Sequence, residues 1–274
     1  MSEDEELENF VTEVQESTKY AQLDSGLVRQ IALEEWKNQK NRRDALKTTR
    51  TRLHRLAGAF LAPKIRYAKW LDNFCSLPPE DVEAFKETSI RMMKLHASTE
   101  ERLPFLDTFY QTCLASIAPV SSVLDLACGL NPLAIRWMPL RKDCTYLACD
   151  VVEPQIDFLN SFFSLTGQIG SAFTCNLLQS IPQQRVQVAF LMKLLPILDQ
   201  VDPATSSNLL DALQADHLLI SYPSKSLGGR SKGMKQTYSE HFDRITSGRK
   251  FKIQWFDFPR SEERRVGKEC RSRW

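Results

Sequence analysis

The spacing of apolar side chains divides the chain into a helical first part and a second part in which strands and helices alternate. Apolar residues recur at helical intervals within residues 3–16, which predicts an amphipathic helix. A second helix is expected to begin after the capping pair Asp24 and Ser25. A third is predicted between Leu46 and Phe60, again from apolar positions on one face. These helices indicate an all-helical N-terminal domain.

The segment that follows is less regular. A proline-containing bridge near residues 74–82 precedes a helix that ends near Lys94. Ser98 or Thr99 is expected to cap the next helix, because Glu101 stands three positions after Ser98, as in a capping box. That helix is predicted to carry the apolar residues up to Leu114.

From residue 122 onward, short apolar runs alternate with helical patterns. Helices are expected at residues 153–165 and 203–215. Strands are predicted at residues 122–126, 145–150, 171–176, 186–194, 217–222 and 251–258. This alternation predicts an α/β fold with a doubly wound, mostly parallel sheet.

The first of these strands leads into the turn that carries the candidate chemistry. Asp125 lies at the strand end and Gly129 in the turn, where the missing Cβ lets a ligand approach the backbone. The next strand ends in Asp150, at the position where a carboxylate accepts hydrogen bonds from ribose hydroxyls. The turn lacks the Gly-x-Gly-x-x-Gly fingerprint, so a dinucleotide is the weaker interpretation. A βα turn without a ligand is the alternative, but Asp150 favours a site for S-adenosylmethionine.

Arg102 falls in the first turn of a predicted helix, where a cation is unfavourable without a partner. A ligand carboxylate is one candidate partner. Glu100 or a nearby Asp is the structural alternative, and the spacing alone favours it.

Composition limits the class of protein. The 274 residues, 42% of them hydrophobic, can build one large domain or a core with an extension. Seven cysteines without a Cys-x-x-Cys pair indicate reduced thiols, and no metal site is expected. No apolar run approaches membrane-spanning length and the N-terminus is acidic, which argues against a signal peptide. We expect a cytoplasmic, monomeric protein without membrane contact.

The net charge is only +2, but the charges are segregated along the chain. Residues 3–16 carry seven acidic and no basic side chains, whereas basic residues dominate from Lys37 to Arg66. Within the third predicted helix, helical spacing places four side chains on one stripe: Arg43, Lys47, Arg50 and His54. A solvated helix face is the plain explanation, but the density of positive charge favours contact with the phosphates of a nucleic acid.

A second basic segment follows the fifth predicted strand. It contains Lys225, Arg230 and Lys232, three glycines and no acidic residue. Loops at the carboxyl ends of strands bind substrates in α/β sheets, so a phosphate-bearing partner is expected here. A surface loop that is basic by chance is the alternative.

Several segments together resemble the aminoglycoside-resistance 16S rRNA methyltransferases, the Arm/Rmt/Sgm group. The most specific are Ala-Cys-Gly-Leu-Asn-Pro at residues 127–132 and Lys-Ser-Leu-Gly-Gly-Arg at residues 225–230. The resemblance runs from about residue 17 to 258, and its blocks are residues 50–60, 96–102, 124–134, 191–196 and 221–234. It implies a Rossmann-like S-adenosylmethionine-dependent methyltransferase sheet with an N-terminal helical domain that docks on 16S rRNA.

The resemblance also implies the reaction: methyl transfer to N7 of guanine 1405 in the A site of the assembled 30S subunit, with aminoglycoside resistance as the outcome. Guanine N7 already carries a lone pair in the major groove, so no general base and no catalytic acid–base residue is expected. Catalysis would consist of positioning the two reactants in line.

Site residues follow from the resemblance position by position. Arg102 would bind the methionine carboxylate, Asp150 the ribose, and Asn176 and Leu177 would flank the adenine. The full set expected to bind the cofactor is His96, Ser98, Arg102, Asp125, Ala127, Gly129, Asp150, Val151, Asn176, Leu177 and Lys193. The residues expected to contact RNA are Arg43, Lys47, Arg50, Arg52, His54, Lys64, Arg66, Lys225, Arg230, Lys232 and Met234.

The carboxyl end departs from the family. Residues 260–274 carry six basic and three acidic side chains and do not alternate like a strand. They resemble a foreign or frameshifted end, which predicts that the last strand is missing and that a sheet edge is open. The expected organisation is a helical rRNA-binding domain at 1–75, a methyltransferase domain at 76–259 and this tail.

Two other functions remain open from the residues. The first is methyl transfer to another RNA or to a small molecule, for which the basic helical domain would have no purpose. The second is a noncatalytic RNA-binding relative, inactivated by its altered tail.

Overall fold

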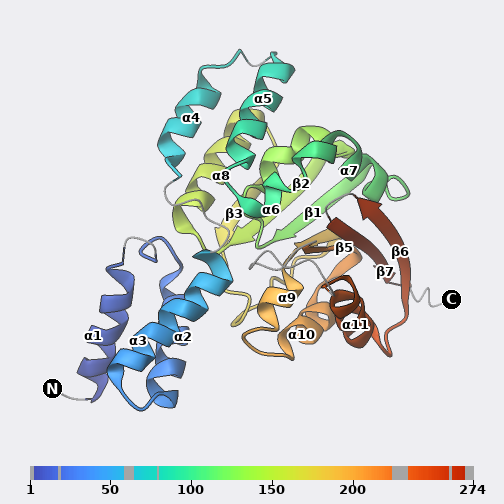
Figure 1. Cartoon of the computed structure of the whole chain (residues 1–274). Coiled ribbons are helices and arrows are strands. Elements are labelled where there is room, and N and C mark those ends of the chain that lie inside the picture. The colour runs from blue at the N-terminus through green and yellow to red at the C-terminus, as the bar shows by residue number, and fades with distance from the viewer. Residues whose placement is uncertain are drawn as a thin grey trace.

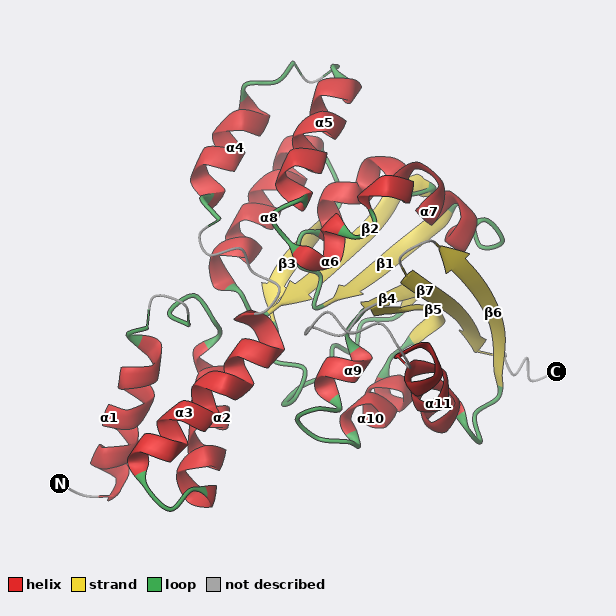
Figure 2. Ribbon diagram, viewed as in Figure 1, coloured by secondary structure: helices red, strands yellow, loops and turns green. Residues whose placement is uncertain are grey.

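A computed structural model describes residues 3–17, 20–58, 65–78, 80–223, 234–258 and 261–268. Its centre is one seven-stranded sheet with the order β3-β2-β1-β4-β5-β7-β6 (Figures 1 and 2). The strands β1 to β5 run parallel, and β7 is antiparallel to both β5 and β6. The strands are β1 Val120–Leu126, β2 Leu140–Asp150, β3 Gly170–Thr174, β4 Val186–Met192, β5 Ala215–Pro223, β6 Phe251–Phe258 and β7 Ser261–Lys268. The predicted α/β class is confirmed.

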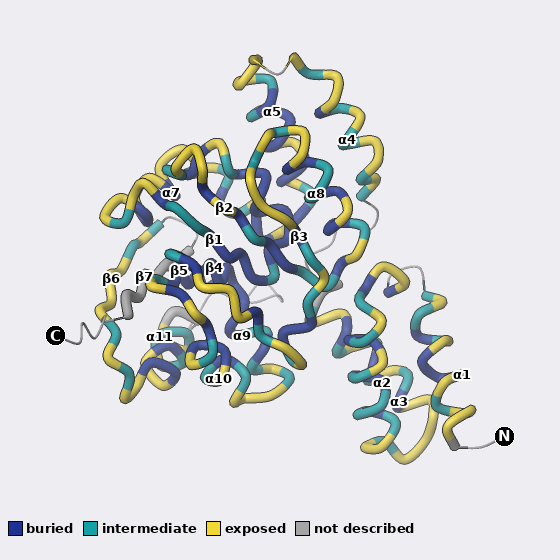
Figure 3. Tube along the Cα trace, turned by 180° about the vertical axis from the view of Figure 1, so that it is seen from behind, coloured by how far each residue is buried: buried dark blue, intermediate teal, exposed yellow. Residues whose placement is uncertain are grey.

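Helices cover both faces of the sheet because the central strands are apolar on both sides. Along β4, Val188 and Phe190 point into one core and Ala189 and Leu191 into the other, as the twofold alternation of a strand requires. The first core is closed by α4 Tyr67–Cys75, α5 Val82–Met93, α7 Leu106–Leu114 and α8 Glu153–Thr166. The second is closed by α9 Leu195–Leu198, α10 Thr205–Ala212 and α11 Met234–Thr246. The tube in Figure 3 shows the central strands as the most buried part of the fold.

The three N-terminal helices form a separate unit beside the sheet (Figure 1). They are α1 Glu3–Gln15, α2 Ser25–Asn38 and α3 Arg42–Leu53, and a π-helical turn, η1 His54–Gly58, continues α3. Asp24 caps α2 as predicted, because its carboxylate accepts a hydrogen bond from the Leu27 amide at 2.7 Å. One small apolar cluster, with Phe10, Val11, Ala32 and Ala45, lies within the unit, and a second also includes Val152, which follows β2 of the sheet. We call α1–α3 with η1 the helical unit.

The predicted domain boundary at residue 75 is too late. Phe74 of α4 packs against Phe85 and Phe162, with ring centroids 5.1 and 5.3 Å away. Helix α4, which the sequence pattern did not predict, therefore belongs to the core of the methyltransferase sheet. Among the described residues, the division between the two parts falls between Gly58 and Ile65.

The helix predicted to begin at Ser98 or Thr99 is broken in the structure. A short α6, Ala97–Glu100, and a 3-10 turn, η2 Leu103–Phe105, precede α7, and His96 rather than Ser98 or Thr99 is the N-cap of α6. The Thr99 hydroxyl instead donates to the Met93 carbonyl at 2.6 Å. The capping box is therefore wrong, because this hydroxyl binds backward to the preceding helix.

The expectation that the last strand is missing is wrong, whereas the foreign or frameshifted origin of the tail stays a prediction. Residues Ser261–Lys268 form β7, which pairs with β5 on one side and with β6 on the other. A strand between two strands is fixed by backbone hydrogen bonds on both edges, so tertiary context outweighs the weak strand pattern. The strand that was expected to be missing is thus present.

Helix α11 was not predicted from the sequence pattern. Among the described residues, no helix is long and apolar enough to cross a membrane.

Candidate active site

The turn after β1 and the end of β2 are joined by one carboxylate. Gly129 and Val151 donate their backbone N–H groups to the two oxygens of Asp150, at 2.8 and 2.7 Å. Gly129 adopts a φ of +52°, and a Cβ built on it would lie 2.6 and 2.7 Å from Cε1 and Nε2 of the His96 ring. Both the backbone angle and this close approach require glycine at this position.

Arg102 lies fully buried beside this turn. Its Nη2 donates to the side-chain oxygen of Asn131 at 2.8 Å, while Nε and Nη1 have no hydrogen-bond partner among the described residues. The amide group of Asn131 donates in turn to Asp125 Oδ2 at 2.9 Å. The structural alternative, a carboxylate partner from Glu100 or a nearby Asp, is therefore wrong: the partner is an amide 29 positions along the chain.

Burial changes the protonation of two groups in this region. It raises the pKa of Asp125 to about 7, although the hydrogen bonds from Asn131 and Tyr146 act in the opposite direction. It lowers the pKa of His96 to about 3, with the positive charges of Arg102 and Lys193 adding to the effect. His96 is therefore neutral at physiological pH.

A cavity opens at the carboxyl ends of β1, β2 and β4, the edge at which α/β sheets bind ligands. Eight residues of the predicted cofactor set line it: His96, Ser98, Ala127, Asp150, Val151, Asn176, Leu177 and Lys193. Arg102, Asp125 and Gly129 do not line its described part. Asp125 instead holds Asn131, and Gly129 contacts His96 and Asp150. Asp125 is thus a positioning residue behind the cavity rather than part of its wall.

Sequence reasoning missed part of the cavity wall. Some of the missed residues directly follow β3 and β4, so their position after a predicted strand was an available signal. Two others, Leu27 and Leu56, come from the helical unit and carried no such signal. The missed residues are Leu27, Leu56, Val152, Gln155, Cys175, Leu178, Met192, Leu194, Ile197 and Leu198.

The comparisons with known proteins agree with this geometry. Residues 16–262 match the family model "Ribosomal RNA methyltransferase (FmrO)". The chain belongs to this family. A 16S rRNA (guanine(1405)-N(7))-methyltransferase of Micromonospora rosea is 35% identical over 77% of this chain and 78% of its own length. One of the same name from Serratia marcescens is 32% identical over 86% and 88%.

Solved structures of the family have the same fold. The 16S rRNA methyltransferase RmtF, in complex with S-adenosyl-L-homocysteine, matches with a TM-score of 0.82 and 29% identity over 98% of this chain and 99% of its own. The 16S rRNA methylase RmtB matches with a TM-score of 0.79 and 25% identity over 96% and 98%. This rRNA methyltransferase is therefore S-adenosylmethionine-dependent and acts on ribosomal RNA.

The residues around the cavity fit that cofactor. The two unpaired guanidinium nitrogens of Arg102 are buried donors that a carboxylate would satisfy. Asp150 lines the cavity at the end of β2, where a ribose is bound in folds of this type. S-adenosylmethionine supplies a methyl group on a sulfonium, and the residues present can hold its two polar ends.

Lys193 ties the end of β4 to the segment that carries Arg102. It has a φ of +60°, and its backbone N–H donates to the Ser221 carbonyl of β5 at 3.1 Å. Its ammonium group lies 2.5 Å from Oε2 of Glu101. The Lys193 side chain lines the cavity and is only 3% exposed. The carboxylate of Glu101 therefore balances its positive charge inside this rRNA methyltransferase.

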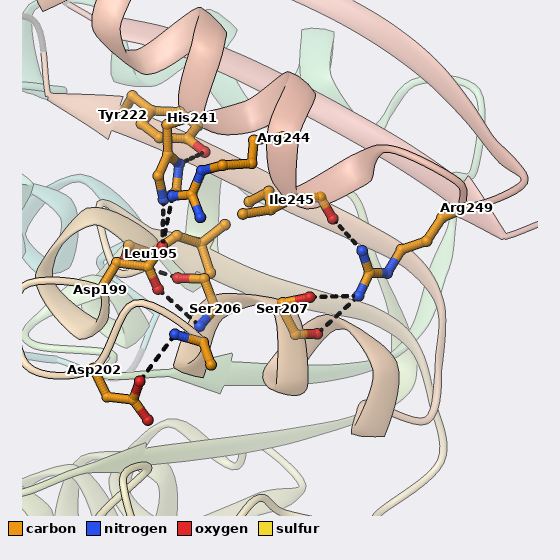
Figure 4. Close-up of polar contacts among 11 residues, drawn as sticks. Leu195, Asp199, Asp202, Ser206, Ser207, Tyr222, His241, Arg244, Ile245 and Arg249 are labelled. Atoms are coloured by element: carbon orange, nitrogen blue, oxygen red, sulfur yellow. Dashed lines mark hydrogen bonds and ion pairs between the residues drawn. The ribbon is translucent and has the colours of Figure 1, made fainter.

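A hydrogen-bonded chain holds α11 in place beside the end of β5 (Figure 4). The Tyr222 hydroxyl lies 2.9 Å from Nδ1 of His241, and His241 Nε2 lies 2.7 Å from Asp199 Oδ2. The other oxygen of Asp199 accepts from the Ser206 amide at 2.9 Å, which links α11 to α10. The chain thus fixes the elements on both sides of residues 224–233. The predicted RNA contacts Lys225, Arg230 and Lys232 lie outside the described residues, and Met234 is described only as the start of α11.

The basic stripe forms one surface of the helical unit. Arg43, Lys47, Arg50 and His54 line a single shallow hollow along α3 and η1. Arg52 points elsewhere, because its guanidinium pairs with Glu35 at 2.7 Å and Glu34 at 2.8 Å on α2. We therefore remove Arg52 from the expected RNA contacts and assign it to the packing of α3 on α2. Arg66 is exposed at the start of α4, and Lys64 lies outside the described residues.

Proposed function

We propose that this rRNA methyltransferase methylates N7 of guanine 1405 of 16S rRNA in the A site of the assembled 30S subunit, and that it thereby confers aminoglycoside resistance. The observation that carries the proposal is the similarity to relatives of that name, at 35% and 32% identity over most of both chains. Asp150 in the cavity wall, the buried Arg102 beside the turn after β1, and the basic stripe on the helical unit support it.

The chemistry needs positioning rather than proton transfer. Guanine N7 carries a lone pair in the major groove, so it can attack the methyl group directly, and the methyl–sulfur bond breaks as the methyl–nitrogen bond forms. In the proposal, Arg102 holds the methionine carboxylate, Asp150 the ribose, and Asn176 with Leu177 the adenine. The target base has to leave its stack to reach the cavity.

We assign recognition of the 30S subunit to the basic stripe on α3 and η1. Arg43 and Lys47 are exposed, Arg50 is half-buried, and all three border the same hollow. Cationic side chains on such a surface neutralise phosphates and set the orientation of the enzyme without reading sequence. Lys225, Arg230, Lys232 and Met234 remain predicted contacts at the target base.

The test is transfer of a labelled methyl group from S-adenosylmethionine to purified 30S subunits, with naked 16S rRNA alongside. We expect label on 30S only, and strand scission specific for 7-methylguanine at nucleotide 1405. Label at another nucleotide, or equal labelling of naked rRNA, would contradict the proposal. Expression in a sensitive bacterium should raise the inhibitory concentration of gentamicin.

A charge-matched pair of triple variants tests the stripe. Replacing Arg43, Lys47 and Arg50 by Gln should weaken 30S binding at least tenfold and reduce the slope of log Kd against log salt. The control replaces three other cations by Gln: Arg141, Lys142 and Arg185. They are exposed near the amino ends of β2 and β4, away from the cavity. Equal losses in the two variants would show that only net charge matters.

A further inference from the structure

The helical unit forms part of the wall of the cofactor cavity. Leu27 of α2 and Leu56 of η1 line it together with Leu177 and Leu178, which follow β3. Leu27 is 3% exposed and packs in an apolar cluster that joins α2 and α3 to Val152 after β2. A ligand in this cavity therefore contacts both parts of the protein.

Backbone contacts join the helical unit to the turn that follows Asp150. Leu23 forms an isolated antiparallel bridge with Val152. The Asp24 amide donates to the Val151 carbonyl at 2.7 Å, and the Glu153 amide donates to the Gln22 carbonyl at 3.0 Å. The residues directly before α2 are thus attached to the residues directly after the carboxylate assigned to the ribose.

A side-chain contact also joins the helical unit to the part of the cavity wall that is assigned to the adenine. Asn176, which is 7% exposed and lines the cavity, donates from Nδ2 to Oε1 of Gln30 on α2 at 3.0 Å. Its other amide atom, Oδ1, accepts from the Leu178 backbone at 3.1 Å. Because both ends of the amide are engaged, Gln30 fixes its orientation in the cavity wall.

The same unit carries the basic stripe, and the two features meet in η1. His54 borders the basic hollow and Leu56, two positions later, borders the cofactor cavity. Because His54 and Leu56 share one helical turn, a movement of η1 that displaces one of them also displaces the other.

We propose that the helical unit is a working part of the cofactor site and that cofactor binding and rRNA docking are thermodynamically linked through it. Leu56 closes the cavity against the adenosyl end of the cofactor, and Gln30 is a positioning residue that acts through Asn176. The proposal has two halves. The linkage half, in which cofactor binding and rRNA docking affect each other, rests on the proposed function of the stripe. The cofactor half, in which Leu56 and Gln30 contribute to cofactor binding, does not. A cofactor that holds the helical unit against the sheet raises the affinity of the stripe for rRNA, and bound rRNA raises cofactor affinity by the same factor.

The cofactor half is tested without RNA, by calorimetric titration of the full chain with S-adenosylhomocysteine. We expect Leu56→Ala to raise Kd by roughly five- to tenfold, the loss typical of one buried aliphatic contact. The matched control is Leu46→Ala, which removes a partly buried leucine that packs in the same helical unit but does not line the cavity. We expect Leu46→Ala to stay within about twofold of wild type. Unchanged binding by Leu56→Ala, or an equal loss in both variants, would overturn the proposal.

Gln30 is tested in the same assay. Gln30→Ala should raise Kd by roughly threefold or more, since it frees the Asn176 amide. Arg29→Ala is its neighbour on α2 and pairs outward with Glu8, so it should bind as wild type does. If Gln30→Ala also binds as wild type does, Gln30 is not a positioning residue.

The linkage half is tested by 30S affinity with and without saturating S-adenosylhomocysteine. We expect the ligand to tighten wild-type 30S binding by roughly fivefold or more, and to tighten binding of Leu56→Ala by less than about twofold. Wild-type 30S binding that does not respond to the ligand would overturn the linkage. Absence of any 30S binding would overturn the proposed function instead, and the titration without RNA would still decide the cofactor half.

Discussion

Arg102 donates a hydrogen bond to the side-chain oxygen of Asn131 at 2.8 Å, and its guanidinium also lies over the Phe109 ring, 5.7 Å from the centroid. Its Nε and Nη1 have no hydrogen-bond partner among the described residues. Asn131 is itself held by Asp125, at 2.9 Å. A guanidinium held in this way is ordered before any ligand arrives, so little side-chain entropy is lost when a carboxylate pairs with its remaining nitrogens.

Replacing Arg102 should therefore remove cofactor binding. We expect Arg102→Met to raise the Kd for S-adenosylhomocysteine by at least about 30-fold, because the loss of a buried charge-assisted pair costs about 2–5 kcal/mol. Calorimetric titration measures it. The exposed Arg91, whose guanidinium donates to Thr88 on its own helix, provides the control variant Arg91→Met. A folded Arg102→Met protein that binds the cofactor normally would remove Arg102 from the site.

Gly129 should not accept a side chain unless His96 is also changed. The Cβ of Gly129→Ala would lie 2.6 Å from the His96 ring and the backbone would keep a φ of +52°. We expect the variant to lose about 2–3 kcal/mol of unfolding free energy in urea, from steric overlap and from the left-handed backbone.

The double variant Gly129→Ala with His96→Ser separates the two causes. Removing the ring should recover the steric part and leave about 1 kcal/mol for the backbone angle. If the double variant is no more stable than Gly129→Ala, contact with His96 is not the reason for glycine here.

Asp125 should make stability depend on pH. Burial raises its pKa from 3.8 to about 7, so the folded protein binds a proton that the unfolded chain has released. That proton stabilises the fold fully below about pH 4, and the stabilisation is lost as pH rises through about 7. We expect the unfolding free energy of Asp125→Asn to lack this decrease, which is at most about 4 kcal/mol in wild type.

Urea unfolding between about pH 5 and 8 measures the difference. The control is Asp143→Asn, since Arg141 lowers the pKa of the exposed Asp143 and that carboxyl does not titrate in this range. Parallel pH profiles for wild type and Asp125→Asn would contradict the prediction.

The last strand should be required for folding. A chain ended after Phe258 lacks β7 and leaves β6 without its hydrogen-bonded partner and β5 with an open edge. We expect it to aggregate or to lose its cooperative thermal transition. A chain ended after Lys268 keeps all seven strands and should melt as the full chain does. Equal melting temperatures for the two shortened chains would show that β7 contributes nothing.

The sequence by itself determined the elements whose causes are local. The apolar runs that became β1, β2 and β4, the Asp24 cap of α2, and the placement of Gly129 and Asp150 at strand ends depend on neighbours within a few positions. Six of the eight predicted cofactor residues in the cavity wall lie at strand ends, and they meet there because the carboxyl ends of parallel strands share one edge of the sheet; His96 and Ser98 come from α6 instead.

Only the tertiary structure decided the rest. Asn131 as the partner of Arg102, Glu34 and Glu35 as the partners of Arg52, and Leu56 in the cofactor wall join segments far apart in the chain. Strand β7 exists because two flanking strands offer it hydrogen bonds on both edges. Periodicity and capping act along the chain, whereas pairing and cavity walls are set by which surfaces meet when the core closes.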